Sequence, residues 1–414
     1  MLRTSISLPR FPALLLCVAL PLYLAIRGSA SFSDIALLLS SLSERAEALH
    51  VKLTSPLATP PAPISKKSLD PPGEPAKTVR EPEDERRKRY RHLPDGLAHC
   101  INSFEQYSFL AEQGLQRKHA RYSKQNLAQK AITNELGYPA HFEKARKGIE
   151  VNAQFSEKIA LVGREDYHTG PQALEDREDA EFGLVDLAFG HLLRDWSLQG
   201  AEERKAVFPP ILGRLERHFG GNGMGKKVLV PGSGAGYDVT ANELDYGSIL
   251  AYHLLTNHTN SLHQHTLQPF VTKWAHQANP SSRYSASTVP DHWPNKAVKL
   301  VEGDFLEMFP RDDEFDSVVT LFFIDMSDNV IDFLSNIHRL LKPGGVWINL
   351  GPLKWGSYSA IQLSAEEVLD LAVLLGFDVD HTSRKSIDSL YAEQPETLLK
   401  FTYVTQFWSA TKRG

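Results

Sequence analysis

The sequence contains little cysteine and no excess of positive charge. Cys17 and Cys100 are the only cysteines among 414 residues, and Cys17 lies in an apolar stretch. A disulfide framework is therefore excluded as the basis of the fold. The formal net charge of -5 provides no field that would attract a polyanion. We expect no general nucleic-acid-binding protein, although a local basic patch stays compatible with this charge.

The composition is that of a globular protein with appendages. Hydrophobic residues make up 42% of the chain and charged residues 23%, which is enough for an ordinary core. We predict four regions along the chain. They are a signal peptide or signal anchor (1–30), a short helix with a linker rich in proline and charge (31–92), a helical N-terminal lobe (93–220) and an α/β domain (221–414).

An apolar segment lies close to the N-terminus. The stretch Phe11–Ile26 follows Arg10 and precedes Arg27, which is the pattern of a signal peptide. Pro21 interrupts it, and it is shorter than the roughly 20 residues of a membrane span. An uncleaved signal anchor attached to a membrane and an ordinary N-terminal helix are the alternatives, so the compartment is left open.

Helical patterns precede the α/β domain. Between about Asp95 and Leu161 a set of large residues is spaced as the buried stripe of helices: Phe104, Tyr107, Leu110, Leu115, Tyr122 and Leu127. A further helix begins near Ala180, and we expect it to be broken at Gly200 and by Pro209 and Pro210.

After Gly225 apolar strand patterns alternate with helical ones. Strands are expected at 227–230, 239–242, 298–302, 317–324, 346–350, 377–380 and 401–408, and helices at 248–256, 330–341 and 365–375. This alternation predicts a doubly wound, Rossmann-like α/β sheet with an antiparallel C-terminal edge strand. Ligands of such sheets bind beyond the carboxyl ends of the strands.

Three features follow strand ends in this domain. Gly232, Gly234 and Gly236 form a glycine turn that allows a ligand close to the backbone, or else a simple tight turn. Glu243 ends the next strand, where a carboxylate can accept both ribose hydroxyls of an adenosine. Asp304 ends another strand and can accept an adenine amino hydrogen. The alternatives are a surface glutamate and an aspartate that caps the next turn.

The stretch from about Arg194 to Trp408 resembles the carnosine N-methyltransferase family of class I S-adenosylmethionine-dependent methyltransferases. The motifs that carry the resemblance are RDWSLQGAEER, VLVPGSGAG, TLQPFV, VEGDF, LFFIDMSDNVIDFL and LKPGGVWINLGPL. The resemblance implies S-adenosylmethionine as cofactor and an imidazole nitrogen as methyl acceptor, in carnosine, a related histidine-containing peptide or a protein histidine. The implied residues are Gly232, Gly234, Glu243 and Asp304 for the cofactor, and Asp325 and Tyr403 on the substrate side.

The chemistry gives Asp325 a clear task. A neutral imidazole has one N–H donor and one lone pair, so a carboxylate that accepts the N–H fixes the tautomer and directs the lone pair at the methyl group. Free imidazole titrates near 6.5, so no strong base is needed and positioning supplies most of the rate. Asp325 as the cap of a helix near Asn329 is the weaker alternative, because Ser327 and Asp328 are better placed for that.

The chain departs from the family in two places. Only six residues, 237–242, separate Gly236 from Glu243, whereas a parallel crossover takes about a dozen. Either the helix that anchors the cofactor is lost, or the sequence derives from a gene model that dropped a segment, which we favour. After GPL the histidine that the family carries on the substrate side is absent. Trp355 or Tyr358 either replaces part of that substrate contact or serves packing.

Three alternatives remain. His253, His258, His263 and His265 match no familiar metal-ligand spacing, so we expect no metal. A rival function is a catalytically impaired, membrane-tethered binding protein with the methyltransferase fold. A nicotinamide oxidoreductase also uses a glycine turn, but the Lys342–Gly345 turn argues against it. The oligomeric state, a homodimer included, is left open.

Overall fold

The computed structural model describes residues 96–169, 179–220, 223–231, 238–394 and 396–414. These residues all belong to one compact unit, Glu81–Gly414. The apolar segment Phe11–Ile26, the linker, Gly232 and Gly234 lie outside the described residues, and the four-region division stays a prediction. Within the described ranges no helix is both long and apolar enough to cross a membrane.

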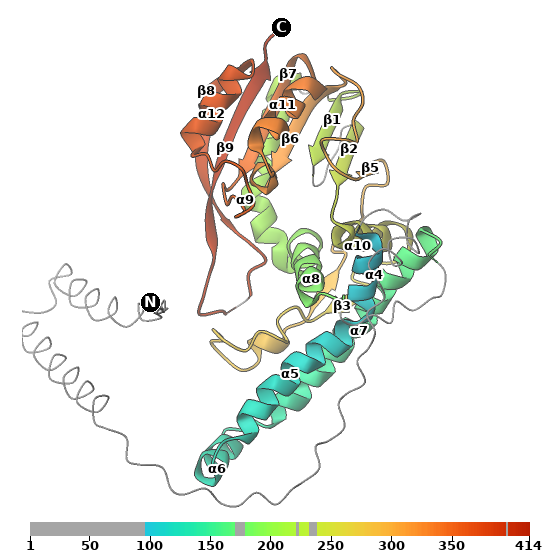
Figure 1. The fold of residues 1–414 in the computed structure, drawn as a ribbon, viewed down its shortest axis with the longest axis vertical. Coiled ribbons are helices and arrows are strands. Elements are labelled where there is room, and N and C mark those ends of the chain that lie inside the picture. Colours follow the sequence, from blue (N-terminus) through green and yellow to red (C-terminus); the bar gives the residue numbers. More distant parts are fainter. Residues whose placement is uncertain (1–95, 170–178, 221–222, 232–237, 395) are drawn as a thin grey trace, which may run out of the picture. The chain divides into compact units, whose positions relative to one another are not determined.

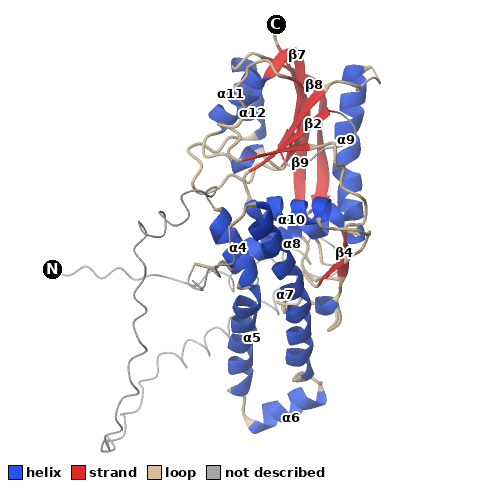
Figure 2. Ribbon diagram, turned by 90° about the vertical axis from the view of Figure 1, so that its right-hand side faces the viewer, coloured by secondary structure: helices blue, strands red, loops and turns tan. Residues whose placement is uncertain are grey.

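The first described elements are helices (Figure 1): α4 (Leu97–Glu105), α5 (Tyr107–Ser123), α6 (Leu127–Glu135) and α7 (Ala140–Asp166). α5 and α7 pack side by side, and α6 connects them at their far end (Figure 2). Phe104, Tyr107 and Leu115 of the predicted stripe are buried.

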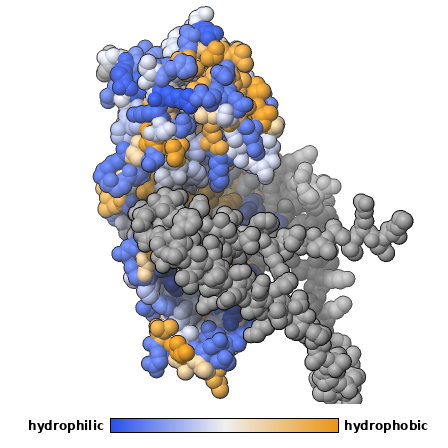
Figure 3. Space-filling model, turned by 90° about the vertical axis from the view of Figure 1, so that its left-hand side faces the viewer, coloured by the Kyte–Doolittle hydropathy of each residue, from blue (hydrophilic) through white to orange (hydrophobic). Residues whose placement is uncertain are grey.

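Leu127 was wrongly placed in the buried stripe. Its side chain is 87% exposed, and Ile132 and Leu136 on either side of the end of α6 are exposed as well. Apolar side chains accordingly gather at the end of the molecule where α6 lies (Figure 3). The reason is local: the Asn126 side chain accepts the Gln129 N–H in a capping box, so α6 is set by its own cap rather than by packing.

The next helices are α8 (Phe182–Trp196), the short 3₁₀ turn η1 (Leu198–Gly200) and α9 (Ala201–Phe219). The break expected at Gly200 is confirmed, since α8 ends at Trp196 and α9 begins at Ala201. A Cβ on Gly200 would collide with the carbonyl of Arg194, so this turn requires glycine. The break expected at Pro209 and Pro210 is wrong, since α9 continues through both. Val207 and Ile211 on either side are buried against the sheet, so tertiary packing outweighs the lost backbone bonds.

The main sheet has seven strands in the order β5-β2-β1-β6-β7-β9-β8. Their bounds are β1 (Lys227–Pro231), β2 (Asp238–Glu243), β5 (Lys299–Glu302), β6 (Phe315–Leu321), β7 (Leu341–Gly351), β8 (Phe377–Leu390) and β9 (Thr402–Lys412). The first five in this order run parallel, and β9 pairs antiparallel with β7 and β8. The predicted doubly wound α/β class is confirmed, but β9 lies inside the sheet and β8 forms the edge, because the long β8–β9 hairpin inserts its second strand next to β7.

Helices cover both faces of the sheet. They are α9 on one face and α11 (Val330–Leu340) and α12 (Ala365–Leu374) on the other (Figure 2). Alternate residues of β1 divide between the two cores: Val228 and Val230 pack with α9, and Leu229 packs with α11 and α12. α10 (Tyr246–Asn257) packs instead on α7 and α8, next to the small sheet of β3 (His265–Leu267) and β4 (Ser287–Val289).

The lysine-proline-glycine-glycine turn lies within β7. Pairing with β6 begins at Leu341 opposite Phe315, is interrupted at Lys342–Gly345, and resumes at Val346 opposite Ser317. Gly344 has a φ of 75°, which glycine adopts without strain. A Cβ on Gly345 would lie 2.8 Å from the Lys342 carbonyl oxygen and 3.1 Å from that of Asp316. Gly344 is therefore needed for its backbone conformation, and Gly345 for the close approach of two backbone carbonyls.

Gly345→Ala is expected to lower the free energy of unfolding by roughly 1–3 kcal/mol, because the methyl group has to displace backbone atoms. Gly213→Ala is the matched control, since nothing lies within 4 Å of a Cβ there in the middle of α9. The control should be stabilised by roughly 0.5–1 kcal/mol. Thermal unfolding of both variants measures this, and equal shifts of the same sign would contradict the described turn.

Candidate functional site

Parallel strands bring their carboxyl ends to one edge of the sheet. β2 ends at Glu243, β5 at Glu302, β6 at Leu321 and β7 at Gly351. The Gly303 N–H donates to the Glu243 carbonyl at 2.8 Å, which joins the segments after β2 and β5. Because Asp304 and Asp325 follow β5 and β6, the fold brings three of the predicted site residues to this edge.

β1 and β2 are direct parallel neighbours despite their short connection. Lys227 lies opposite Asp238 and Pro231 opposite Asn242. The chain between the two strands consists of the six residues 232–237. Six residues are too few for a crossover that ordinarily contains a helix. The predicted glycines Gly232 and Gly234 belong to this connection.

Glu243 is half-buried at the end of β2. Its Oε1 accepts the backbone N–H groups of Leu244 and Asp245, both at 2.9 Å. Burial raises the pKa of this carboxyl group, and the backbone donors and the charge of Arg194 oppose that rise. Both backbone bonds fall on one oxygen, so the carboxylate is fixed in orientation while Oε2 can accept bonds from a ligand.

Asp304 is half-buried after β5, and its Oδ1 accepts the Leu306 N–H at 2.8 Å. The turn-capping interpretation of this residue is therefore confirmed. The capping bond uses one of its two oxygens. Asn242 stiffens the same region, because its side-chain amide donates to the carbonyls of Val301 and Gly303 at 2.9 Å each.

Asp325 is almost completely buried, with 4% of its surface exposed. It lies in the short turn η3 (Ile324–Met326) after β6, and its Oδ2 accepts the Lys354 N–H, which follows β7, at 2.8 Å. Burial raises the pKa of its carboxyl group, and the Lys354 N–H and the Lys354 charge oppose that rise. The Lys354 N–H thus orients one oxygen of a carboxylate that is costly to ionise where it lies.

The cap of α11 is neither Asp325 nor the two residues that we expected. Asn329 caps the helix, and its side chain accepts the Ile331 N–H at 3.1 Å. The prediction of Ser327 or Asp328 was wrong because α11 begins at Val330, so that Asn329 occupies the cap position. The Ser327 hydroxyl donates to the Ile324 carbonyl at 2.9 Å, and the Asp328 carbonyl accepts the Ala360 N–H at 2.7 Å.

The loop after β7, where the resemblance predicts a histidine that this chain lacks, packs over the Asp325 segment. The Ser359 hydroxyl donates to the Ser327 carbonyl at 2.9 Å. Trp355 donates its indole N–H to the Leu363 carbonyl of its own loop and packs on the core, so packing is its observed role. Tyr358 is 57% exposed and does not close the site.

An aromatic cluster lies three residues before Asp325. Phe322 has a φ of 51°, which is rare for an aromatic residue and typical of functional turns. Its ring centroid lies 5.7 Å from that of Tyr391 and 5.9 Å from that of the predicted Tyr403. The centroids of the two tyrosine rings are 6.1 Å apart. Phe322 and Tyr391 were not predicted from the sequence. The FFID motif was a signal for Phe322, but Tyr391 reaches the aromatic cluster only through the tertiary fold.

α8 supports this cluster through two more residues that the sequence analysis did not assign. The Arg194 guanidinium lies 4.8 Å from the Tyr391 ring centroid and forms two 2.7 Å bonds to the Asp195 carboxylate. His191 Nε2 lies 3.1 Å from the Tyr391 hydroxyl, and His191 Nδ1 lies 2.9 Å from Ser248 Oγ. Burial lowers the pKa of His191, which favours the neutral ring.

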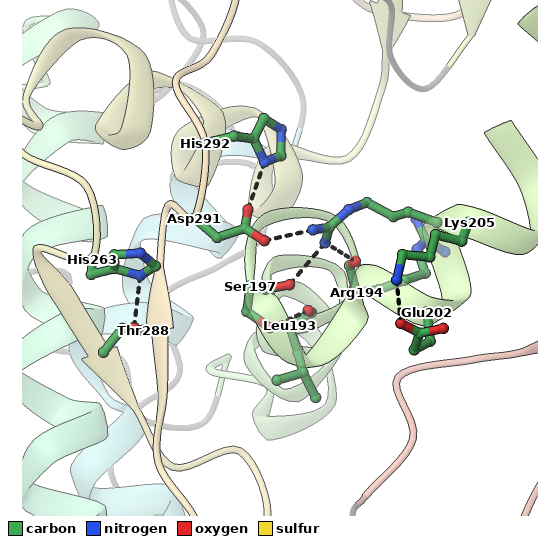
Figure 4. Close-up of polar contacts among 10 residues, drawn as sticks. Leu193, Arg194, Ser197, Glu202, Lys205, His263, Thr288, Asp291 and His292 are labelled. Atoms are coloured by element: carbon green, nitrogen blue, oxygen red, sulfur yellow. Dashed lines mark hydrogen bonds and ion pairs between the residues drawn. The ribbon is translucent and has the colours of Figure 1, made fainter. Parts of the chain in front are cut away.

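The acidic and basic run after RDWS fixes the end of α8. Arg204 donates to the carbonyls of Arg194 at 2.7 Å and Ser197 at 2.9 Å and pairs with Asp291 at 2.5 Å. Asp291 also contacts His292 at 2.6 Å (Figure 4). The largely buried pair of Arg204 and Asp291 thus fixes the backbone at Arg194.

Glu203, the neighbour of Arg204, reaches the loop between β8 and β9. Its two oxygens accept the N–H groups of Ala392 and Glu393 at 2.9 Å each. These residues directly follow Tyr391, so the helix α9 sets the position of that ring.

The four clustered histidines have ordinary partners. His253 contacts Glu302 at 3.1 Å, His258 contacts Asp166 at 3.2 Å, and His265 lies 2.8 Å from the Thr259 hydroxyl. In the part of the chain that the structure describes, no group of three or more His, Cys, Asp or Glu side chains could hold a metal ion.

Comparison with known proteins adds a family and relatives. The family model described as carnosine N-methyltransferase matches residues 172–414. A Drosophila melanogaster carnosine N-methyltransferase is 30% identical over 53% of this chain and 53% of its own length. The mouse carnosine N-methyltransferase is 25% identical over 81% of this chain and 89% of its own, and that of Schizosaccharomyces pombe is 24% identical over 75% and 94%.

Solved methyltransferase structures also match, at low similarity. A SAM-dependent methyltransferase from Methanosarcina mazei is 13% identical over 46% of this chain and 93% of its own, with a TM-score of 0.29. A Haemonchus contortus phosphoethanolamine N-methyltransferase in complex with S-adenosylmethionine is 14% identical over 58% and 59%, with a TM-score of 0.32.

Asp325→Asn is expected to stabilise the protein at pH 8. The raised pKa of Asp325 means that its ionisation opposes folding above that pKa, whereas below the ordinary value of about 3.9 the penalty is absent. The gain in melting temperature should therefore shrink as the pH falls through the raised pKa towards about 4. Asp370→Asn on the exposed face of α12 should change little at any of these pH values. A destabilised Asp325→Asn variant at pH 8 would contradict the described burial.

Proposed function

Because the chain belongs to the carnosine N-methyltransferase family, whose model matches residues 172–414, we propose that this methyltransferase transfers the methyl group of S-adenosylmethionine to an imidazole nitrogen of carnosine or a related histidine-containing peptide. The observation that carries the proposal is the buried Asp325 carboxylate, which the Lys354 N–H orients at the carboxyl edge of the sheet.

Two described carboxylates fit the cofactor. When bound, S-adenosylmethionine supplies an electrophilic methyl group next to the acceptor. Glu243 would accept the ribose hydroxyls through Oε2, since its Oε1 already holds two backbone N–H groups. Asp304 would accept the adenine amino group with the oxygen that does not cap the turn. Gly232 and Gly234 would let the cofactor approach the backbone.

Asp325 would act on the acceptor by fixing its tautomer. Its Oδ2 holds the Lys354 N–H, and Oδ1 would accept the N–H of the imidazole. The second ring nitrogen then keeps its lone pair and faces the methyl group. As the ring gains positive charge during transfer, the carboxylate stabilises that charge inside a buried site. A carboxyl group with a raised pKa can also take the imidazole proton.

The cluster of Phe322, Tyr391 and Tyr403 would form the wall against which the imidazole lies. The two tyrosines contact Phe322 from the β8–β9 hairpin, on the segment that leads to Asp325. Flat rings position an aromatic acceptor without competing for its nitrogen. Most of the rate would then come from orientation of the acceptor.

The rival function of a catalytically impaired, membrane-tethered protein has no support from the comparisons. The apolar segment on which it depends lies outside the described residues. Assembly as a homodimer and action on a protein histidine stay predictions as well.

Mass spectrometry of carnosine incubated with the full chain and S-adenosylmethionine tests the proposal, with addition of one methyl group to the imidazole expected. Asp325→Asn should lower kcat/KM about 100-fold or more, because the amide cannot accept the imidazole N–H in the same orientation or stabilise its charge. The affinity for S-adenosylmethionine should stay within about twofold of the unaltered protein.

Asp370→Asn, on exposed α12, serves as the control and should retain full activity. An Asp325→Asn variant with unchanged kcat/KM would contradict the role of Asp325. A folded chain that binds the cofactor but never methylates carnosine would contradict carnosine as the acceptor.

A further inference from the structure

A cavity lies in the helical part of the molecule, on elements that do not form the sheet edge. It has a volume of about 490 Å³. Such a volume lies within the range of roughly 300–1,000 Å³ that is typical of small-molecule sites. Lys118 and Arg121 of α5 line it together with the rings of Tyr122, Tyr138 and Trp274. No acidic side chain lines it.

Lys118 lies among other positively charged side chains. Burial, and then the charges of Arg121, Arg117 and Arg283, lower the pKa of Lys118. No described carboxylate is among the groups that influence Lys118. Lys118 is half-buried and Arg121 is exposed, and both line the cavity, so an anion that enters it gains the attraction of both charges.

A further cation, Arg283, contacts the Trp274 ring but does not itself line the cavity. The residue is 9% exposed, and its Nε and Nη1 atoms are buried without a hydrogen-bond partner in the described part of the chain. A buried guanidinium normally pairs with a carboxylate, because desolvation of an unpaired charge is costly. Here it lies 5.0 Å from the centroid of the Trp274 ring, and the Lys118 ammonium lies 5.9 Å from the same ring.

The rings that line the cavity are held rigidly by one another. The ring centroid of Tyr138 lies 5.9 Å from that of Trp274, in an edge-on arrangement, and 5.5 Å from that of Tyr122. The centroids of Phe142 and Trp274 are 5.1 Å apart. Aromatic side chains of this kind provide a surface on which a planar ligand can stack. The lining therefore combines positive charge for an anion with a flat apolar wall for a ring.

We propose that this cavity binds a phosphate-bearing ligand with an aromatic ring, of the size of a nucleotide. Lys118 and Arg121 would pair with the phosphate groups, and the ring would lie against Trp274 and Tyr138. Arginine favours phosphate because its planar donors match the phosphate oxygens in pairs. S-Adenosylmethionine carries no phosphate, so this site is not a second place for the methyl donor.

Calorimetric titration of the full chain with ADP, pyrophosphate and adenosine tests the proposal, with S-adenosylmethionine present at saturation to block the sheet edge. ADP should bind more tightly than pyrophosphate, and adenosine should not bind measurably. Lys118→Gln combined with Arg121→Gln should weaken ADP at least about tenfold, since both changes remove a charge that pairs with phosphate. The affinity for ADP should also fall as salt is added.

Lys296→Gln combined with Lys299→Gln is the matched control, because it removes the same charge from exposed positions on other elements. This control should leave the affinity for ADP unchanged, and both double variants should methylate carnosine at the rate of the unaltered protein. Absence of ADP binding, or ADP binding that both double variants retain, would overturn the site. Pyrophosphate that binds as tightly as ADP would overturn the role of the aromatic wall. Because the carnosine assay is separate, these outcomes leave the proposed methyl transfer unaffected.

Discussion

The contact between the Asp325 carboxylate and the Lys354 N–H fixes the geometry on which the proposed chemistry depends. It joins the segment after β6 to the segment after β7 at 2.8 Å. The same two strand ends approach each other so closely that a Cβ on Gly351 would lie 3.1 Å from the Phe322 nitrogen. Phe322 takes its unusual φ at this point. Asp325 is thereby held at the sheet edge in a place where its charge is costly, which is the usual condition of a carboxylate kept for function.

The aromatic wall depends in turn on helices far away in the sequence. Arg204 clamps the end of α8 through the carbonyls of Arg194 and Ser197, and Glu203 holds the backbone directly after Tyr391. Two adjacent residues of one helix therefore position two parts of the site. The RDWSLQGAEER stretch thus acts on the aromatic wall through positioning.

The sequence predicted the parts of the fold that follow local patterns. The alternating strands and helices after Gly225 are confirmed, as is the break at Gly200, because apolar periodicity and the space available to a glycine are local properties. Leu127, Pro209 and Pro210 were misjudged because a local cap in the first case, and packing of α9 on the sheet in the second, outweighed the pattern. The place of β9 within the sheet arises from its pairing with β7, and the contacts of Tyr391 with His191 and Arg194 join segments about 200 residues apart. No local pattern contains either.

We propose that the carboxyl edge binds S-adenosylmethionine although six residues join β1 to β2. The decisive measurement is calorimetric titration of the folded full chain with S-adenosylmethionine. We expect binding at one site, and a loss of about tenfold or more in affinity for Glu243→Gln, because a neutral amide accepts the ribose hydroxyls less strongly. A folded chain that takes up no S-adenosylmethionine would show that the carboxyl edge is not a cofactor site.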